Sequence, residues 1–272
     1  MFKKIFAFYT FYSLCFFLPL HSDVNMQVME LGIQHRDFDL PFTEVTIANQ
    51  KFLLLIDTGC SATISLNERL TQKLPLIYTG NKISFYRPNG TIYHSKEIVI
   101  PEIVFGEISC QNVAGREDGK WLEETSLSKQ GILGLNFLQN YHVIFDLGNN
   151  KLILSKSEET IRQLDYPLEK WTSHPFSLTN VGIVLEGEIN QHPCKFVLDS
   201  GSSHTVLKRS FLTNNKITEA NSVDICGTKI KNPLLLELQE PSQVDGVIGN
   251  NFFSSHKLYF NFEKNLLLIG KD

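Results

Sequence analysis

The sequence Phe52-Leu-Leu-Leu-Ile-Asp57-Thr58-Gly59 occurs a second time, with small changes, as Lys195-Phe-Val-Leu-Asp199-Ser200-Gly201. Each copy is an apolar run that ends on Asp, a hydroxyl residue and Gly. A single tripeptide of this kind usually marks an ordinary turn, because all of these residue types are common in turns. Two copies in matching apolar surroundings indicate an internal repeat.

The residues before each Asp also align without gaps. Residues 45–57 match residues 187–199, and in both segments a polar turn separates two runs rich in β-branched and aromatic residues. Such runs around a short polar turn are typical of β-hairpins. We expect one hairpin to end on Asp57 and its counterpart to end on Asp199.

A second motif follows each hairpin in the same order. Gly131-Ile132-Leu133-Gly134 matches Gly246-Val247-Ile248-Gly249, and two more strand-like runs follow each of them. The aspartates at 57 and 199 are 142 positions apart, whereas the glycines at 131 and 246 are 115 apart, so the second copy is 27 residues shorter. The repeat predicts an all-β chain of two related lobes.

The extra residues of the first copy include a predicted hairpin. Its turn is Asn89-Gly90, the strongest short hairpin signal, between strand-like residues 83–88 and 91–94. A two-residue turn predicts that Tyr86 lies opposite Tyr93. The second copy has no comparable hairpin. A polar loop is expected over residues 114–130, before the first glycine motif.

The repeat also sets the expected domain boundaries. Residues 1–22 have two lysines before an apolar stretch, as in a secretory signal peptide. Cleavage is expected near its end, and an uncleaved anchor is the alternative. Residues 23–154 form the predicted N-terminal lobe, 155–173 a polar linker and 174–272 the C-terminal lobe. The signal predicts a secreted or periplasmic, extracytoplasmic protein.

Composition narrows the functional classes. The chain has 272 residues, 42% of them hydrophobic, and a formal net charge of -4. This content supports a proper core, and the absence of a Lys or Arg stripe argues against nucleic acid and anionic membrane surfaces.

Cysteine and histidine add two expectations. Without the signal segment four cysteines remain, Cys60, Cys110, Cys194 and Cys226, which allow two disulfides or none. No Cys-x-x-Cys occurs and the eight histidines are scattered, so we expect no metal site.

Two equivalent acidic loops suggest a specific chemistry. If Asp57 and Asp199 meet across a pseudo-twofold axis, both cannot ionise comfortably and the pair shares a proton. One carboxyl is then an acid and the other a base. Such a pair can activate a water to attack a carbonyl without a metal or a nucleophilic side chain.

At these residues the chain resembles the aspartic peptidases, both the two-lobed pepsin-like enzymes and the single-lobed retroviral-type enzymes. The resemblance covers about residues 38–269 and includes both pairs of motifs. It implies an all-β, bilobal acid-protease fold with the active site between two barrel-like lobes. It further implies an endopeptidase for polypeptide substrates that needs no cofactor, works as a monomer and contacts a membrane only if the N-terminal segment stays uncleaved.

The resemblance also implies roles for individual residues. Asp57 and Asp199 correspond to the catalytic pair. Supporting positions are the loop residues Thr58, Gly59, Ser200 and Gly201, the glycine-motif residues Ile132, Leu133, Gly134, Val247, Ile248 and Gly249, and the flap residues Tyr86, Asn89, Gly90 and Tyr93. The two tyrosines are either substrate contacts or a cross-strand aromatic pair. Cys60 stands where pepsin-like enzymes usually have Ser, which suggests sensitivity to oxidation or thiol reagents.

Other interpretations explain less of the sequence. Serines beside the aspartates suggest a serine hydrolase, but no Gly-x-Ser-x-Gly motif is present. Paired carboxylates also serve glycosidases, which do not normally take them from a duplicated Asp-Thr-Gly loop. Two alternatives stay open: structural turn acids in a duplicated β domain, and a catalytically inactive peptide-binding protein of the same fold.

Overall fold

The structure, a computed structural model, describes residues 28–86, 92–106, 108–118, 130–215, 217, 219–220, 222–225, 227–231, 233–236 and 243–270. The predicted signal peptide, Asn89, Gly90 and Cys226 lie outside these residues. None of the helices in this part of the chain is long and apolar enough to cross a membrane.

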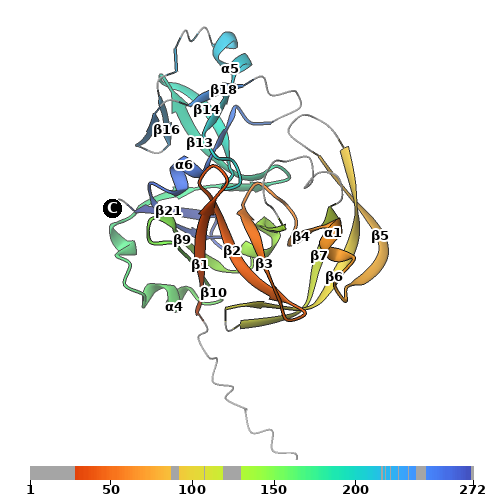
Figure 1. The fold of residues 1–272 in the computed structure, drawn as a ribbon. Coiled ribbons are helices and arrows are strands. Elements are labelled where there is room, and N and C mark those ends of the chain that lie inside the picture. Colours follow the sequence, from red (N-terminus) through yellow and green to blue (C-terminus); the bar gives the residue numbers. More distant parts are fainter. Residues whose placement is uncertain are drawn as a thin grey trace, which may run out of the picture.

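Strands dominate the first copy of the repeat (Figure 1). Its elements are β1 (Val28–Arg36), β2 (Leu40–Ile47), β3 (Gln50–Asp57), β4 (Ile64–Asn67), α1 (Glu68–Thr71), β5 (Ile77–Tyr86), β6 (Ile92–Phe105), β7 (Ile108–Asp118), β8 (Gly131–Gly134), α3 (Leu135–Leu138), β9 (His142–Asp146), η1 (Leu147–Asn149) and β10 (Lys151–Ser155).

The second copy follows two short helical segments. The elements after β10 are α4 (Glu158–Arg162), η2 (Leu168–Lys170), β11 (Thr172–Pro175), β12 (Ser177–Thr179), β13 (Gly182–Ile189), β14 (His192–Leu198), β15 (Val206–Lys208), α5 (Arg209–Asn214), β16 (Ser222–Ile225), β17 (Thr228–Lys231), β18 (Leu234–Leu236), β19 (Gly246–Ile248), α6 (Asn250–Phe253), β20 (Lys257–Asn261) and β21 (Leu266–Gly270).

The two lobes have the same strand topology around their aspartates. In the first lobe β3 pairs in parallel with β8, β8 pairs antiparallel with β4, and β4 pairs in parallel with β7. In the second lobe β14, β19, β15 and β18 are connected by the same sequence of parallel and antiparallel pairings. The all-β, two-lobed prediction is therefore confirmed.

The lobes differ in how they close. In the first lobe the order β2-β3-β8-β4-β7-β6 returns to its start through a pairing of β2 with β6, so these strands form a closed barrel. The second lobe has the open order β17-β16-β13-β14-β19-β15-β18, with β12 added beside β13.

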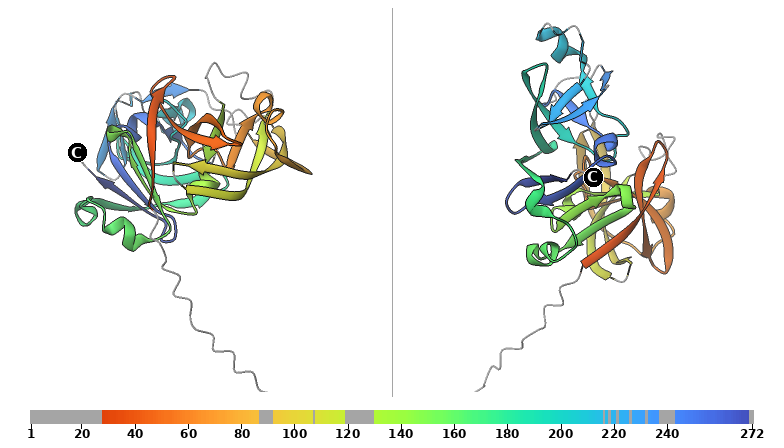
Figure 2. Two further views of the ribbon diagram at one scale, coloured as in Figure 1. Left: turned by 60° about the horizontal axis from the view of Figure 1, so that its bottom comes forward. Right: turned by 90° about the vertical axis from the view of Figure 1, so that its left-hand side faces the viewer.

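A shared sheet joins the lobes. Its strand order is β11-β21-β20-β9-β10-β1, and the junction between the copies is the antiparallel pairing of β9 with β20. The views in Figure 2 show the two sets of lobe strands meeting at this sheet. Phe145 of β9 contacts Phe253 and Phe260 with ring centroids 5.2 and 5.6 Å apart. Burying each such ring contributes about 1.5–3 kcal/mol, so the sheet and its aromatic layer hold the lobes together.

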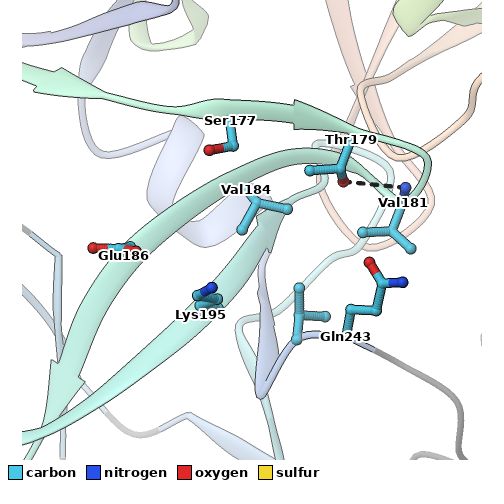
Figure 3. A pocket seen from close by; sticks show the side chains of 8 residues that line it. Ser177, Thr179, Val181, Val184, Glu186, Lys195 and Gln243 are labelled. Carbon is cyan, nitrogen blue, oxygen red and sulfur yellow. Dashed lines mark hydrogen bonds between the residues drawn. The ribbon is translucent and has the colours of Figure 1, made fainter.

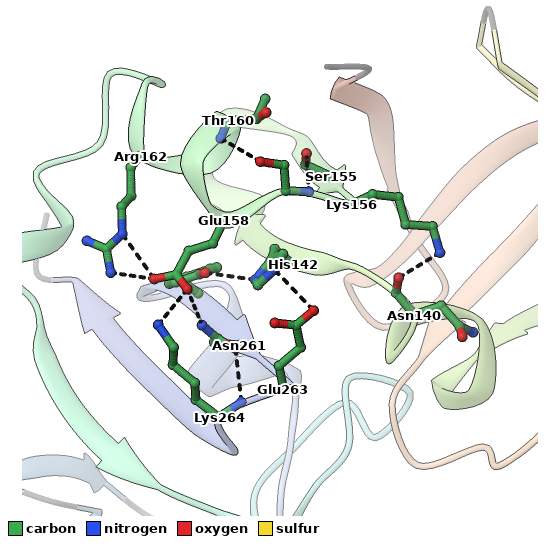
Figure 4. Close-up of polar contacts among 12 residues, drawn as sticks. Asn140, His142, Ser155, Lys156, Glu158, Thr160, Arg162, Asn261, Glu263 and Lys264 are labelled. Atoms are coloured by element: carbon green, nitrogen blue, oxygen red, sulfur yellow. Dashed lines mark hydrogen bonds and ion pairs between the residues drawn. The ribbon is translucent and has the colours of Figure 1, made fainter. Parts of the chain in front are cut away.

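The predicted linker contains α4 and η2 and is fixed to the second lobe by charge. Glu158 of α4 accepts hydrogen bonds from Lys264 at 2.6 Å and from Arg162 at 2.5 Å (Figure 4). The side-chain nitrogen Nδ2 of Asn261 donates a further hydrogen bond to Glu158 at 3.2 Å. Ser157 caps the helix through the amide of Thr160. These contacts join the segment between the lobes to the turn that connects β20 and β21.

The register of the flap hairpin differs from the prediction. Tyr86 pairs with Ile92, and Tyr93 pairs with Phe85, so the two tyrosines do not form the expected cross-strand pair. A shift of the register by one residue moves every side chain of a strand to the opposite face of the sheet. The register is therefore set by which face of the whole strand is buried, and not by the residues of the turn. Ser95 is buried on β6 while its neighbours Lys96 and His94 are exposed, which fixes that face.

Candidate active site

The two aspartates lie at equivalent ends of buried strands. Asp57 is the last residue of β3, and Asp199 directly follows β14. Each strand lies inside its sheet, between its hairpin partner and a parallel strand, and the residues just before the aspartates are buried on both faces. This explains the continuous apolar runs in the sequence, which are typical of strands covered on both sides.

Backbone amides of each loop hold the carboxyl group of that loop. The amide of Gly59 donates to Asp57 Oδ1 at 2.9 Å, and the amide of Gly201 donates to Asp199 Oδ1 at 2.9 Å. Asp199 Oδ1 accepts a second amide bond, from Ser202, at 3.1 Å. Both carboxyl groups are therefore oriented by the main chain before any ligand binds.

Thr58 and Ser200 bind the two loops to each other reciprocally. The amide of Thr58 donates to Ser200 Oγ at 3.1 Å, and the amide of Ser200 donates to Thr58 Oγ1 at 3.0 Å. The hydroxyls in turn donate to the carbonyls of Leu198 and Ile56, at 2.9 and 2.8 Å. Both side chains are fully buried, so these four bonds form a dry connection between the lobes.

Each loop glycine makes room for the aspartate of the other lobe. A Cβ added to Gly59 would lie 2.5 Å from Cγ of Asp199, and a Cβ added to Gly201 would lie 2.5 Å from Cγ of Asp57. Real Cβ atoms do not approach other atoms this closely. Each carboxyl group thus packs over the glycine of the opposite loop, which brings the two carboxyls side by side.

This juxtaposition determines the protonation of the pair. Burial raises the pKa of Asp199 well above its ordinary value, and the charge of Asp57 and a hydrogen bond between the two carboxyls raise it further. Amide bonds from Gly201 and Ser202 offset only part of the effect. The site therefore keeps a proton at pH values where a free aspartate is ionised.

The glycine motifs support the loops from behind. Gly134 lies opposite Asp57 in the parallel register of β3 and β8, and the amide of Asp199 donates to the carbonyl of Ile248 at 2.9 Å. A Cβ on Gly134 would lie 2.2 Å from the carbonyl oxygen of Ala62. Gly249 is equally crowded, at 2.3 Å from the carbonyl oxygen of His204. Of the remaining motif residues, Ile132, Leu133 and Ile248 are fully buried and Val247 is half-buried.

The expected flap residues are only partly described. Tyr86 ends β5, and Tyr93 is half-buried near the start of β6. The hairpin tip, with Asn89 and Gly90, lies outside the described residues. His204, in the loop that follows Asp199, is exposed, and its ring contacts the hydroxyl of Ser203.

Cys60 does not have the chemistry that its position suggested. Its side chain is buried, and this burial raises the pKa of the thiol to about 12. A thiol that stays protonated is a poor nucleophile, so the expected thiol sensitivity is wrong. Cys60, Cys110 and Cys194 all carry free thiols, and Cys226 lies outside the described residues.

A group of buried charges that the sequence did not predict lies beside the site. Arg116, Glu117 and Asp118 were expected in a polar loop, yet they end β7 and are only 5%, 4% and 1% exposed. The loop prediction is wrong there because each charge has hydrogen-bonded partners on neighbouring strands or on β7 itself. One cue was available: these residues directly continue the strand-like segment 108–113.

A cavity of about 170 Å³ lies in the second lobe. Figure 3 shows it between β12, β13, β14 and residues 243–244. Its walls combine valines with the cross-strand pair Glu186 and Lys195. The cavity contains none of the motif residues, so it is not part of the site formed by the two loops.

Comparison with known proteins agrees with this geometry. Residues 43–140, which run from β2 past the first glycine motif, match the family described as gag-polyprotein putative aspartyl protease. Basic 7S globulin from soybean has a similar structure, with a TM-score of 0.61 and 12% identity over 91% of this chain and 95% of that chain. No curated protein matches the sequence significantly. The resemblance to aspartic peptidases and the bilobal acid-protease fold are thus confirmed.

Proposed function

We propose that the protein is an aspartic endopeptidase that hydrolyses peptide bonds with a water held between Asp57 and Asp199. One observation supports this most directly: each carboxyl packs over the glycine of the opposite loop, so two acids from two lobes form one proton-sharing pair. A pair of unrelated turn acids has no reason to be placed in this reciprocal way.

The proposed reaction uses the two protonation states of the pair. The pair holds one proton, and the proposal places it on Asp199, whose pKa is raised by burial and by the neighbouring carboxyl, and gives Asp57 the role of base. Asp57 takes a proton from the water as the water oxygen attacks the peptide carbonyl carbon. Asp199 donates its proton to the carbonyl oxygen, which gives a tetrahedral diol. Asp57 then passes the proton it took from the water to the amide nitrogen while Asp199 takes a proton back from a hydroxyl of the diol; the C–N bond breaks, the carboxylic acid and amine leave, and the pair returns to its starting state.

The proposal also covers the oligomeric state, the hairpin that covers the substrate and the location of the protein. Both halves of the site come from one polypeptide, which supports a monomeric enzyme. The hairpin of β5 and β6 is proposed to cover the bound polypeptide and to exclude water during the reaction. The apolar N-terminal segment supports export to a secreted or periplasmic location. The reaction needs no cofactor.

The test is cleavage of an unfolded protein by three variants. Asp57→Asn and Asp199→Asn should each lower the rate by at least about 10²-fold while circular dichroism stays unchanged. Asp165→Asn is the matched control, because it makes the same change at an exposed carboxylate outside the two aspartate loops. Full activity of either dyad variant would contradict the mechanism. Binding of a statine-type inhibitor by a wild-type protein that cleaves nothing would favour the inactive peptide-binding alternative.

A further inference from the structure

The charged residues at the end of β7 form two separate networks on opposite faces of the strand. Glu117 accepts hydrogen bonds from Tyr78 at 2.5 Å and from Lys96 at 2.6 Å, which fastens the base of the flap hairpin. Arg116 and Asp118, two positions apart, point to the other face. Buried charges need such partners, because an unpaired one costs several kcal/mol.

Arg116 and Asp118 pair with each other in a dry environment. Arg116 Nε lies 3.0 Å from Asp118 Oδ2, and the two side chains are 6% and 0% exposed. Asp118 also accepts hydrogen bonds from the hydroxyls of Ser65 on β4 and Ser95 on β6. The carboxylate is therefore fully bonded and fixes the position of the guanidinium.

The guanidinium of Arg116 also reaches the Asp57 loop. Its Nη2 donates to Cys60 Sγ at 3.5 Å, and Cys60 directly follows Asp57-Thr58-Gly59. The amide of Cys60 donates to the carbonyl of Asp57, and its own carbonyl accepts the amide of Leu135 beyond the glycine motif. A buried cation thus lies one side chain away from the loop that carries Asp57.

The second lobe replaces this group with leucines. Ser65, Leu66 and Asn67 pair in parallel with Arg116, Glu117 and Asp118, while the matching strand β15 pairs Val206, Leu207 and Lys208 with Leu234, Leu235 and Leu236. Ser65 pairs with Ile132 of the first glycine motif, and Val206 pairs with Val247 at the same position of the second motif. Ser65 and Val206 are therefore equivalent positions in the two lobes. Ser202, at the position of Cys60, donates its hydroxyl to the carbonyl of His204.

We infer that Arg116 and Asp118 are positioning residues that set the pH range in which the Asp57–Asp199 pair holds one proton. The inference rests on the proposed function. The charge of Arg116 favours the ionised form of Asp57, and the opposite charge of Asp118 offsets this in part.

Other titratable groups surround these two, and all of them stay constant in the test. Asp57 faces Asp199 and Cys60, as described above. Arg116 lies opposite Glu97 of β6, which is bonded to Thr79 and Asn81. Lys96 and Glu117 occupy the other face, and Lys208 is buried in the second lobe.

The test is the pH dependence of kcat/KM for a quenched peptide. Arg116→Gln should move both limbs of the bell-shaped profile to higher pH by roughly half to one pH unit, because the anionic pair loses a nearby cation. Asp118→Asn should move both limbs to lower pH, because the negative charge of Asp118 no longer offsets the positive charge of Arg116. The double variant should return close to the wild-type profile. Arg162→Gln, which removes an arginine charge from a solvent-exposed ion pair on α4, is the control and should move neither limb.

A purely structural role predicts a different result. It would lower the rate of both variants at every pH and leave the limbs in place, and that outcome would overturn the inference. If Arg116→Gln does not fold, Arg116→Lys should keep the wild-type profile while Asp118→Asn alone shifts it; equal profiles for all three proteins would also overturn it. A wild-type protein without hydrolysis at any pH would contradict the proposed function instead, and the pH dependence of statine-inhibitor binding would then measure the same shifts.

Discussion

Asp199 packs directly over Gly59, so close that one added methyl group on the glycine would lie 2.5 Å from its carboxyl carbon. Gly201 has the same relation to Asp57. These two contacts connect the lobes at the point where the chemistry is proposed to occur. They make the geometry of each aspartate depend on a residue of the other lobe.

Gly59→Ala and Gly201→Ala should each lower kcat/KM by on the order of 10²-fold, because a displacement of about 1 Å is enough to misalign reacting groups. The rate is measured with a peptide substrate, and circular dichroism checks the fold. Gly32→Ala is the matched control, since nothing lies within 4 Å of a Cβ at that position of β1. Unchanged activity in both loop variants would show that the carboxyls are not held in contact.

Thr58→Val and Ser200→Ala should each lower the free energy of unfolding by about 1–3 kcal/mol, because each leaves buried backbone groups without partners. The double variant should cost less than the sum of the two, since both changes break the same network. Urea unfolding measures the three values. Thr58→Ser keeps the hydroxyl and should be close to wild type. Additive effects would mean that the two hydroxyls act independently.

Asp199→Asn should become more stable relative to wild type as the pH rises. The pKa of Asp199 is raised in the folded protein, so its protonated form stabilises the fold and this contribution is lost as the pH rises through the folded pKa. Asparagine does not ionise and avoids that loss. The difference in Tm between the two proteins should be smallest below pH 4 and grow toward neutral pH. A constant difference across this range would contradict the raised pKa.

Glu158→Gln should lower Tm by about 2–4 °C near neutral pH, the effect expected of a largely solvent-screened charge network. The hydrogen bond from Lys264 lowers the pKa of Glu158 from 4.5 to about 2. Because this folded-state pKa is lowered, the stabilisation is present above pH 4.5 and is lost as the pH falls to 2. Melting curves from pH 2 to 7 follow it. Glu159→Gln, the next residue on α4, is the control and should change Tm little at any pH.

Sequence repetition was sufficient to predict the core of the site. The loops around Asp57 and Asp199 and the glycine motifs behind them depend on local patterns, namely apolar strands, turn residues and crowded glycines. Two copies of one pattern must fold alike, so their meeting across a pseudo-twofold axis follows from the duplication.

The sequence was insufficient where partners lie far apart along the chain. Arg116 and Asp118 look like a solvated run of charges, and their partners Ser65, Ser95 and Cys60 are all more than 20 positions away. Their structural counterparts are leucines, which no residue-by-residue alignment would match to charges. The hairpin register failed for a similar reason: Asn89-Gly90 is a local signal, whereas the buried face of β6 is chosen by the whole lobe.

The pairing of β9 with β20 has the symmetry of a dimer interface. Ile144 of β9 lies opposite Tyr259 of β20, and these two residues occupy the same position in the two copies of the repeat. On either side of them, Val143 lies opposite Phe260 and Phe145 lies opposite Leu258. Such a contact is isologous: each copy offers the same strand to the other. An isolated first lobe would expose that strand as an unpaired edge, and the partner best suited to cover it is a second identical lobe. The joined chain thus contains, in its middle, a self-complementary surface that two identical lobes could also use to pair.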